Sequence, residues 1–573
     1  MSNIEPIRST TTIVSVDQLP VQSILSHRGK NIVVDHAVDQ DEAIILALGY
    51  QNSFKREFSL WSTFAVSFSV LGLLPSIASC TWYSVAYSGN AGLTWAWLVA
   101  LIGIFAVAGS MAELASAYPT SGGLYYATSQ LAPPKYAVFL SWWVGWSNWL
   151  VQITGAPSVN YGGACMILAL KTFNDPDYTP TNGQTYLLTM ALCFVTSIIS
   201  SFPTKWVAYF NSVGTSLNLI FLFIVWVMIL GGDNRESQGL PKFNSNSFAW
   251  GIDNFTEWPD GIAILMSFMA VIWTMSGYDS PFHLAEECSN AQIATPRAIV
   301  LTATVGGVLG FIFQLALAYT VVDIDAAVNA DLGQPYVSIL AQVLDKKMVY
   351  AATGMTVISS FCMGQACQVA ASRVTFAYSR DGCFPFSKYW MAVNPITQTP
   401  VNAVWFNWFI GQLLLLLIFA GGSAIDAIFS VGAIGSFISF TLPILLRITY
   451  SRNTFRPGPW NLGKFSTVSG VIASCFVILM IPILCFPQYR GADNTPDTMN
   501  WTVVVYFGPM FLASAWYFIY AHKVFKGPRS NIDPSKFVSD DDEAEVIDAK
   551  IASGDEVHVY GSNGDIEKTS SGY

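Results

Sequence analysis

The chain has 573 residues and a formal net charge of −10; 53% of its residues are hydrophobic and only 11% are charged. Soluble proteins carry about 25% charged residues, so a surface this poor in charge would not keep such a long chain in solution. The composition therefore excludes a disordered chain, a nucleic-acid binder and a small disulfide scaffold. It indicates a polytopic membrane protein.

The excess negative charge lies in two polar tails. Residues 1–53 hold six acids and three bases, and residues 526–573 hold eleven acids and five bases. The segment between them, residues 54–525, holds twenty acids and nineteen bases, so the membrane domain is nearly neutral. Serines and lysines in the tails, with the acidic run from Asp540 to Glu543, predict contacts with trafficking or ubiquitination machinery.

Twelve apolar stretches are each long enough for a helix that crosses a bilayer, which needs about 20 residues. Their continuous apolar runs differ from the alternating pattern of a membrane β-barrel, so the expected fold class is an all-α membrane protein of twelve transmembrane helices. The predicted spans are 59–85, 92–116, 136–168, 184–203, 206–230, 261–284, 298–321, 347–374, 400–420, 424–446, 465–486 and 500–521.

The distribution of basic residues predicts the orientation of these spans. Thirteen lysines and arginines fall on one side and six on the other, so the positive-inside rule places both tails in the cytosol. We expect a multi-pass protein of the plasma membrane, with the vacuolar or another internal membrane as the alternative. Neither a metal site nor a nucleophile–base arrangement is visible, so we expect no enzyme activity, no metal and no nucleic-acid partner.

Two of the predicted spans are interrupted by glycine and proline. The first contains Gly72 and Pro75, and the sixth contains Gly277 and Pro281. Proline removes a backbone donor, and glycine allows the chain to leave helical geometry. A simple kink would explain either break alone, but breaks five spans apart are what two inverted five-helix repeats would produce, with a ligand site between them.

The sixth span also carries Asp279, which this reading leaves as the one acid inside the membrane. A lone carboxylate there is costly unless it is paired, protonated or faces a cavity. His283 follows four residues later and shares a helical face with it. The two side chains either bind a substrate cation and relay a proton, or simply satisfy each other.

Charged residues at the cytosolic ends of the predicted helices form a second candidate group. Glu113 ends the second span, Glu286 and Glu287 end the sixth, and Arg373 lies at the same side. They predict an inner gate of acid–base pairs. Arg380 faces this side as well; for Glu287 or Arg380, a solvated helix end is the alternative.

Several of these stretches resemble one transporter family. The segments are Ala112-Glu-Leu-Ala-Ser-Ala-Tyr-Pro-Thr-Ser-Gly-Gly-Leu-Tyr-Tyr126, Gly277-Tyr-Asp-Ser-Pro-Phe-His-Leu-Ala-Glu-Glu287 and Tyr378-Ser-Arg-Asp-Gly-Cys-Phe-Pro385. They resemble the amino acid–polyamine–organocation (APC) superfamily. Leu131-Ala-Pro-Pro-Lys-Tyr136 is similar to its fungal amino acid/choline branch, and Gly72-Leu-Leu-Pro-Ser-Ile-Ala-Ser79 to the GABA (4-aminobutyrate) permeases of that branch.

The resemblance implies a LeuT-like transporter domain with repeats at about 59–230 and 261–446 and two extra helices at about 465–521. It also implies a substrate site between spans one, three, six and eight. Leu73 and Leu74 replace the small residues that many α-amino acid transporters have there, which favours a longer zwitterion or an amine. The substrate-binding candidates are Gly72, Leu73, Leu74, Pro75, Ser76, Asn148, Trp273, Ser276, Gly277, Tyr278 and Asp279.

The predicted function is proton-coupled import of GABA or a related amino compound, without a cofactor. The resemblance and the pair Asp279 and His283 favour a proton as the coupling ion, and sodium stays open. A choline or polyamine permease is the alternative; a polyamine site would need more than one acid, and the sequence indicates only Asp279. A nutrient receptor that does not transport is the alternative of another class.

Overall fold

The computed structural model describes residues 22–25, 31–34, 48, 56, 58–329, 332–491, 494–496, 498–528, 537–538, 557–560 and 566–570. The helices of the first half are α2 (Leu60–Leu71), α3 (Leu73–Ser88), α4 (Asn90–Leu93), α5 (Trp95–Ala117), α6 (Gly123–Leu131), α7 (Ala137–Asn174), α8 (Asn182–Ser200), α9 (Thr204–Gly231), α10 (Asn234–Ser237), α11 (Asn246–Ala249), α12 (Asp260–Thr274), α13 (Ser280–His283) and the short 3-10 helix η1 (Ala285–Glu287).

The second half of the membrane domain is helical as well. Its helices are α14 (Ala291–Thr320), α15 (Ile324–Val328), α16 (Pro335–Val343), α17 (Lys346–Arg380), α18 (Ser387–Trp390), α19 (Val401–Leu415), η2 (Leu416–Ala420), α20 (Gly422–Ile448), η3 (Gly463–Phe465), α21 (Ser466–Ile483), α22 (Thr502–Trp516), η5 (Tyr517–Ala521) and α23 (His522–Val524).

Side chains satisfy the free N–H groups at the start of several spans. Ser59 accepts from the N–H of Ser62 at the start of α2, and Asp345 accepts from the N–H of Met348 at the start of α17, at 2.7 Å. Such caps pair donors that have no intrahelical acceptor. They define where two of the predicted spans begin.

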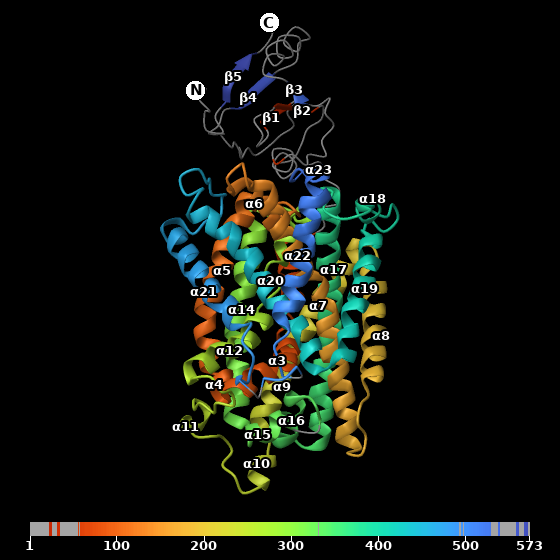
Figure 1. Cartoon of the computed structure of the whole chain (residues 1–573), viewed down its shortest axis with the longest axis vertical. Helices are drawn as coiled ribbons and strands as arrows, with labels where there is room; N and C mark the ends of the chain where they lie inside the picture. The colour runs from red at the N-terminus through yellow and green to blue at the C-terminus, as the bar shows by residue number, and fades with distance from the viewer. Residues whose placement is uncertain are drawn as a thin grey trace.

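The prediction of twelve spans agrees with the helices of the described chain. Nine helical stretches there are long and apolar enough to cross a membrane. The other three predicted spans overlap α7, α12 and α17: α12 is shorter, while α7 and α17 have 38 and 35 residues and carry more polar side chains. The fold class, an all-α multi-span membrane protein, is therefore confirmed (Figure 1).

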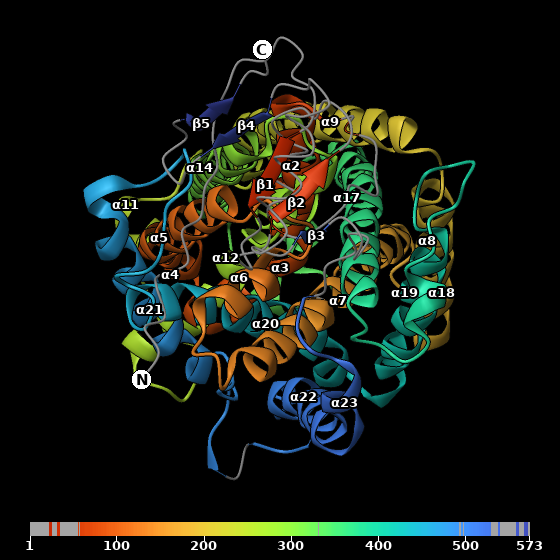
Figure 2. The same cartoon turned by 90° about the horizontal axis from the view of Figure 1, so that it is seen from above.

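The bundle has a buried centre and two distinct ends. Seen along its length, α2, α3 and α12 lie inside, while α8, α19, α21 and α22 lie at the periphery (Figure 2). We call the end where α2 begins and α23 finishes the tail face, and the opposite end, with α10, α11, α15 and α16, the far face (Figure 1).

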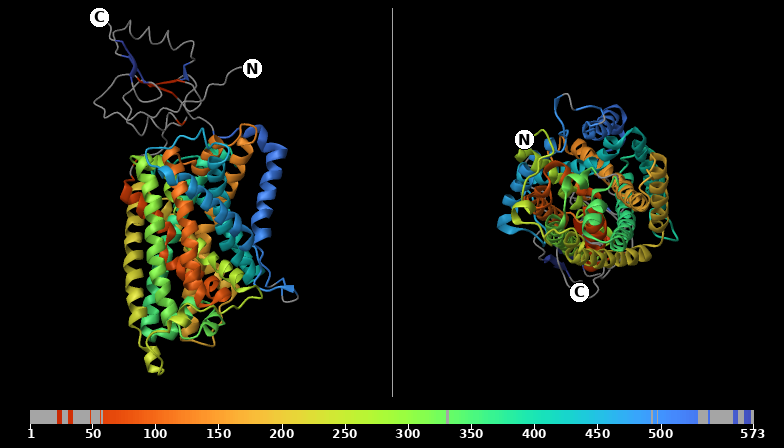
Figure 3. Two further views of the ribbon diagram at one scale, coloured as in Figure 1. Left: turned by 90° about the vertical axis from the view of Figure 1, so that its left-hand side faces the viewer. Right: turned by 90° about the horizontal axis from the view of Figure 1, so that it is seen from below.

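Short strands from the two tails form a five-stranded sheet that the sequence analysis did not predict. The strands lie beyond the tail face (Figures 1 and 3), and their order is β3-β2-β1-β4-β5. The acidic run at 540–543 falls outside the described residues. The strands are β1 (Gln22–Leu25), β2 (Asn31–Val34), β3 (Phe537–Val538), β4 (Val557–Tyr560) and β5 (Ile566–Ser570).

Candidate functional site

The first predicted break is a single residue between α2 and α3. Gly72 has φ +47°, a left-handed conformation that side chains with a Cβ rarely adopt, and a Cβ there would collide with Met363 of α17. Because α3 restarts at Leu73, the N–H groups of Leu73 and Leu74 have no intrahelical acceptor, as in the first turn of any helix. The break therefore offers backbone donors to an anionic group.

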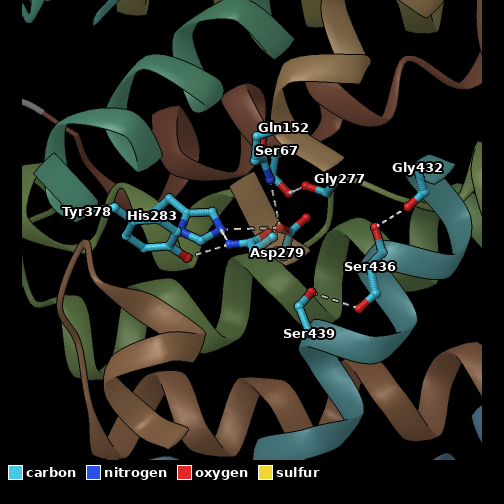
Figure 4. Close-up of polar contacts among 10 residues, drawn as sticks. Ser67, Gln152, Gly277, Asp279, His283, Tyr378, Gly432, Ser436 and Ser439 are labelled. Atoms are coloured by element: carbon cyan, nitrogen blue, oxygen red, sulfur yellow. Dashed lines mark hydrogen bonds and ion pairs between the residues drawn. The ribbon is translucent and has the colours of Figure 1, made fainter. Parts of the chain in front are cut away.

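The second break is longer and touches the first. The chain leaves helical geometry from Met275 to Asp279, with φ +101° at Gly277. A Cβ on Gly277 would lie 2.7 Å from Cγ1 of Val70, and the Ser67 hydroxyl donates to the Gly277 carbonyl at 3.4 Å (Figure 4). Both interruptions thus meet at one point in the bundle.

Asp279 lies at this meeting point, with 2% of its surface exposed. Its Oδ2 accepts from Nε2 of Gln152 at 3.1 Å and lies 3.3 Å from Nε2 of His283 (Figure 4). Nδ2 of Asn148 lies 3.2 Å from the same His283 nitrogen and donates to the Tyr378 hydroxyl at 3.0 Å. The predicted pairing of Asp279 with His283 is therefore present.

The position of the proton in this group depends on Asn148. If Nε2 of His283 carries the proton, it donates to Asp279, and the Asn148 amide must rotate so that its oxygen faces the ring. If Nε2 has no proton, it accepts from Asn148, and Asp279 must carry the proton instead. Either arrangement holds one proton between Nε2 and Oδ2, while Nδ1 of His283 has no hydrogen-bond partner among the described residues.

Two buried ion pairs lie between this group and the tail face. Arg373 donates through Nε to Oε1 of Glu287 at 2.9 Å. Arg380 donates to both oxygens of Glu286 at 3.0 Å, and the N–H of Ser121 donates to Glu286 as well. Glu287 and Glu286 are almost completely buried, so a solvated helix end is the wrong reading of Glu287.

Glu113 belongs to a separate pair at the same end of the bundle. Its Oε2 lies 3.0 Å from NH2 of Arg447, and the Ser466 hydroxyl contacts both carboxylate oxygens. This pair joins α5 to α20 and α21, whereas the other two pairs join the end of the sixth span to α17.

The remaining substrate candidates fall into two groups. The ring of Trp273 packs against Phe429 of α20 at 5.0 Å, and that of Tyr278 lies 5.8 Å from Phe440. Ser276 and Gly277 are partly exposed within this otherwise buried region. These residues surround the second break.

Other candidates in the first span point elsewhere or are already satisfied. A Cβ on Gly310 of α14 would lie 3.1 Å from Leu73, so this side chain faces away from the second break. The Ser76 hydroxyl donates to the Leu71 carbonyl at 2.7 Å. Leu74 and Pro75 are buried in the first turn of α3. Backbone groups, rather than these side chains, are what the first span presents.

Sequence reasoning missed three polar residues of this region. Gln152 lies four residues after Asn148, a spacing that already placed both on one helical face. Tyr378 stands in one of the family-like segments without a predicted role. Asp426 lies two residues inside the predicted span 424–446 but was not predicted as an acid within the membrane; α20 begins at Gly422, so Asp426 lies in its second turn.

A helical bundle with two broken helices around a buried carboxylate is the architecture of a secondary transporter. The family profile described as "Amino acid permease" matches residues 58–509. The chain belongs to this family, which is part of the APC superfamily.

Several fungal relatives cover nearly the whole chain. A Candida albicans protein named "Putative polyamine transporter" is 56% identical over 523 residues, 90% of this chain and 94% of its own length. An uncharacterized amino-acid permease of Schizosaccharomyces pombe is 54% identical over 88% of this chain and 93% of its own length. The "GABA-specific permease" of Saccharomyces cerevisiae is 32% identical over 89% of this chain and 88% of its own length. The relatives' names are those of permeases and transporters rather than enzymes, as the sequence analysis expected.

Proposed function

We propose that this permease carries an organic amine across a membrane by alternating access, coupled to a proton, with polyamines as the first substrate class to test. The observation that carries the proposal is the surroundings of Asp279. Its carboxylate meets Gln152 and His283, but it takes part in no ion pair with lysine or arginine among the described residues. An ammonium group would supply the missing positive charge.

The position of the charged pairs supports alternating access. On the tail-face side, Glu286 and Glu287 are buried against arginines. Towards the far face, Tyr161 and Asp426 are partly exposed. If the tail-side pairs broke and the region around Tyr161 and Asp426 became covered, Asp279 would be exposed to the tail face instead of the far face.

The choice of a polyamine rests on a second acid. A polyamine site needs more than one acid, and the sequence indicates only Asp279, which favours GABA or another single amine. Asp426 in α20 removes that objection. The relative named for polyamines is 56% identical to this chain, and the one named for GABA is 32% identical.

GABA remains the second candidate because of the first break. The unpaired N–H groups of Leu73 and Leu74, at the positive end of the α3 dipole, suit a substrate carboxylate. A polyamine has no carboxylate and would leave these donors unused. Competition between the two substrates therefore separates the candidates.

The proposed coupling ion is a proton held between Asp279 and His283. Titratable groups that face this pair from packed helices are Tyr378 and Cys367 of α17, while α7 contributes the neutral Asn148 and Gln152. An ammonium that binds Asp279 favours its charged form and so leaves the proton to His283. Departure of the substrate reverses this preference.

The proposed orientation follows the positive-inside rule, with the tail face in the cytosol and the protein in the plasma membrane. Contacts of the tails with trafficking or ubiquitination machinery are part of the same proposal. A membrane-impermeant reagent directed at the far face tests the orientation. Added to intact cells, it should inhibit uptake if the far face lies outside the cell.

The test of function is uptake of labelled spermidine, putrescine, GABA and choline by transporter-deficient cells at pH 5.5 and 7.5. We expect polyamine uptake that is faster at pH 5.5, and its abolition by Asp279→Asn with normal protein in the membrane. Asp177→Asn, the same change at an exposed far-face position, should leave uptake unaltered. Normal uptake by the Asp279 variant, or uptake of none of the four compounds, would overturn the proposal.

A further inference from the structure

A second carboxylate, Asp426, lies nearer the far face than Asp279 and is surrounded by tyrosines. The ring of Tyr83 contacts that of Tyr87, and Tyr83 and Tyr161 both contact Phe429, three residues after Asp426 in α20. The Tyr83 hydroxyl donates to the main-chain carbonyl of Asp426 at 3.2 Å rather than to its carboxylate. Residues from α3, α7 and α20 thus meet around one acid.

The rings around Asp426 continue to the second helix break. Tyr83 and Tyr161 each lie within about 6.5 Å of Phe429, at 6.2 and 6.4 Å between ring centroids. Phe429 in turn packs against Trp273, one turn before the unwound segment, at 5.0 Å. Aromatic faces attract ammonium groups, and so the path from Asp426 to the break is lined with surfaces that suit a cation.

The Asp426 carboxylate also differs from the buried glutamates of the tail side. Each of those has an arginine partner, whereas Asp426 takes part in none of the ion pairs between described residues. It is partly exposed, as is Tyr161 beside it. A partly exposed carboxylate among rings, with no basic partner among the described residues, suits a cation from outside the protein.

The spacing between the two acids follows from α7. Gln152 of this helix hydrogen-bonds Asp279, and the ring of Tyr161 in the same helix lies 6.4 Å from that of Phe429, three residues after Asp426 in α20. Gln152 and Tyr161 are nine residues apart, which corresponds to about 13 Å along a helix at about 1.5 Å per residue. Asp279 and Asp426 are therefore separated by roughly this distance along the bundle.

We propose that Asp426 and its aromatic rings form a second ammonium site, so that the two acids hold the two ends of a linear polyamine. This inference rests on the proposed function, in which an amine binds at Asp279. It adds that chain length is selected by the distance between the carboxylates. Trp273 and Phe429 line the methylene chain between them.

The length of a triamine agrees with this spacing. An extended chain advances about 1.25 Å per single bond, given bonds of about 1.5 Å. The nine bonds between the terminal nitrogens of spermidine span about 11 Å, and each ammonium adds a contact of about 2.8 Å to its carboxylate. The five bonds of putrescine span about 6 Å, so with both contacts putrescine reaches about 12 Å even when every group is collinear, which is less than the separation of the two acids.

The test uses unbranched diamines of three to ten carbons as competitors of labelled spermidine uptake. In the wild-type protein we expect the inhibition constant to fall about tenfold between the four-carbon and eight-carbon diamines, as the second ammonium reaches Asp426. Asp426→Asn should remove this dependence on length and leave inhibition by the short diamines unchanged. The control Asp177→Asn should keep it.

Aromatic variants test the rings separately. Tyr161→Phe retains the ring face and should retain the length dependence, whereas Tyr161→Leu should weaken inhibition by long diamines only. An inhibition constant that does not vary with length in the wild-type protein would overturn this inference alone, as would an Asp426→Asn variant identical to wild type.

Failure of the proposed function gives a different result. If no amine is transported, the second site is tested by thermal stabilisation of the purified wild-type protein with the eight-carbon diamine. Stabilisation that Asp426→Asn abolishes would support the site without transport, and its absence would overturn both proposals.

Discussion

Removal of one charge from the buried pair Glu287 and Arg373 gives the sharpest test of the tail-side closure. In Glu287→Gln, the guanidinium of Arg373 stays buried and loses its negatively charged partner, so that its side-chain acceptors among the described residues are neutral: the new amide oxygen and the Ser372 hydroxyl at 3.2 Å. Breaking a buried ion pair in this way costs about 3–5 kcal/mol. At about 1.4 kcal/mol per factor of ten, the closed state loses a factor of about 100 or more in population.

The assay measures both opening and stability. Cys288 follows the pair directly and is fully buried, because the Phe58 N–H donates to the Glu287 carbonyl and the Ser289 N–H donates to that of Phe58. A thiol reagent applied to the tail face should label Cys288 at least tenfold faster in Glu287→Gln than in wild type. The melting temperature of the purified protein should fall as well.

Two controls separate the pair from a general effect of the substitution. Glu236→Gln makes the same change at an exposed far-face position and should alter neither quantity. Replacing Glu287 and Arg373 together with Met removes both charges, so stability should return close to wild type. Unchanged labelling and melting in the single variant would refute the reasoning, and a lower melting temperature with unchanged labelling would assign the pair to the fold rather than to a gate.

Three further predictions concern the broken helices. Gly277→Ala should destabilise the protein by about 2–4 kcal/mol, because of its positive φ and the contact with Val70, and lower its melting temperature; Gly354→Ala, at an open position, should not. Gln152→Leu should raise the KM for the transported amine roughly tenfold, since Asp279 loses a charge-assisted hydrogen bond. His283→Gln should leave uptake equal at pH 5.5 and 7.5; a retained acid preference would exclude His283 as the proton carrier.

Much of the fold could be predicted because membrane spans depend on local composition. Twelve apolar stretches correspond to twelve helical segments of the described chain, and Gly72 and Gly277 mark breaks that glycine and proline already indicated. Asp279 and His283 pair as predicted because four residues separate them near a helical turn. Each of these inferences rests on residues that lie close together in the sequence.

The identities of long-range partners were decided by tertiary structure alone. The sequence could place Glu113 and Arg373 at one side of the membrane, but not assign Arg447 to the first and Glu287 to the second. A helix has several neighbours, and which one faces a given side chain depends on the rotation and tilt of both helices.

Asp426 illustrates the same limit for the candidate site. In the sequence it stands near the start of the predicted span 424–446, where an acid at a helix end and an acid inside the membrane look alike. Tyr83 and Tyr161 are distant from it in sequence and lie near it because residues of α3 and α7 contact α20. Sequence alone therefore determined the class of protein, its helices and one acid of the candidate site, whereas packing between helices decided which aromatic rings lie beside Asp426.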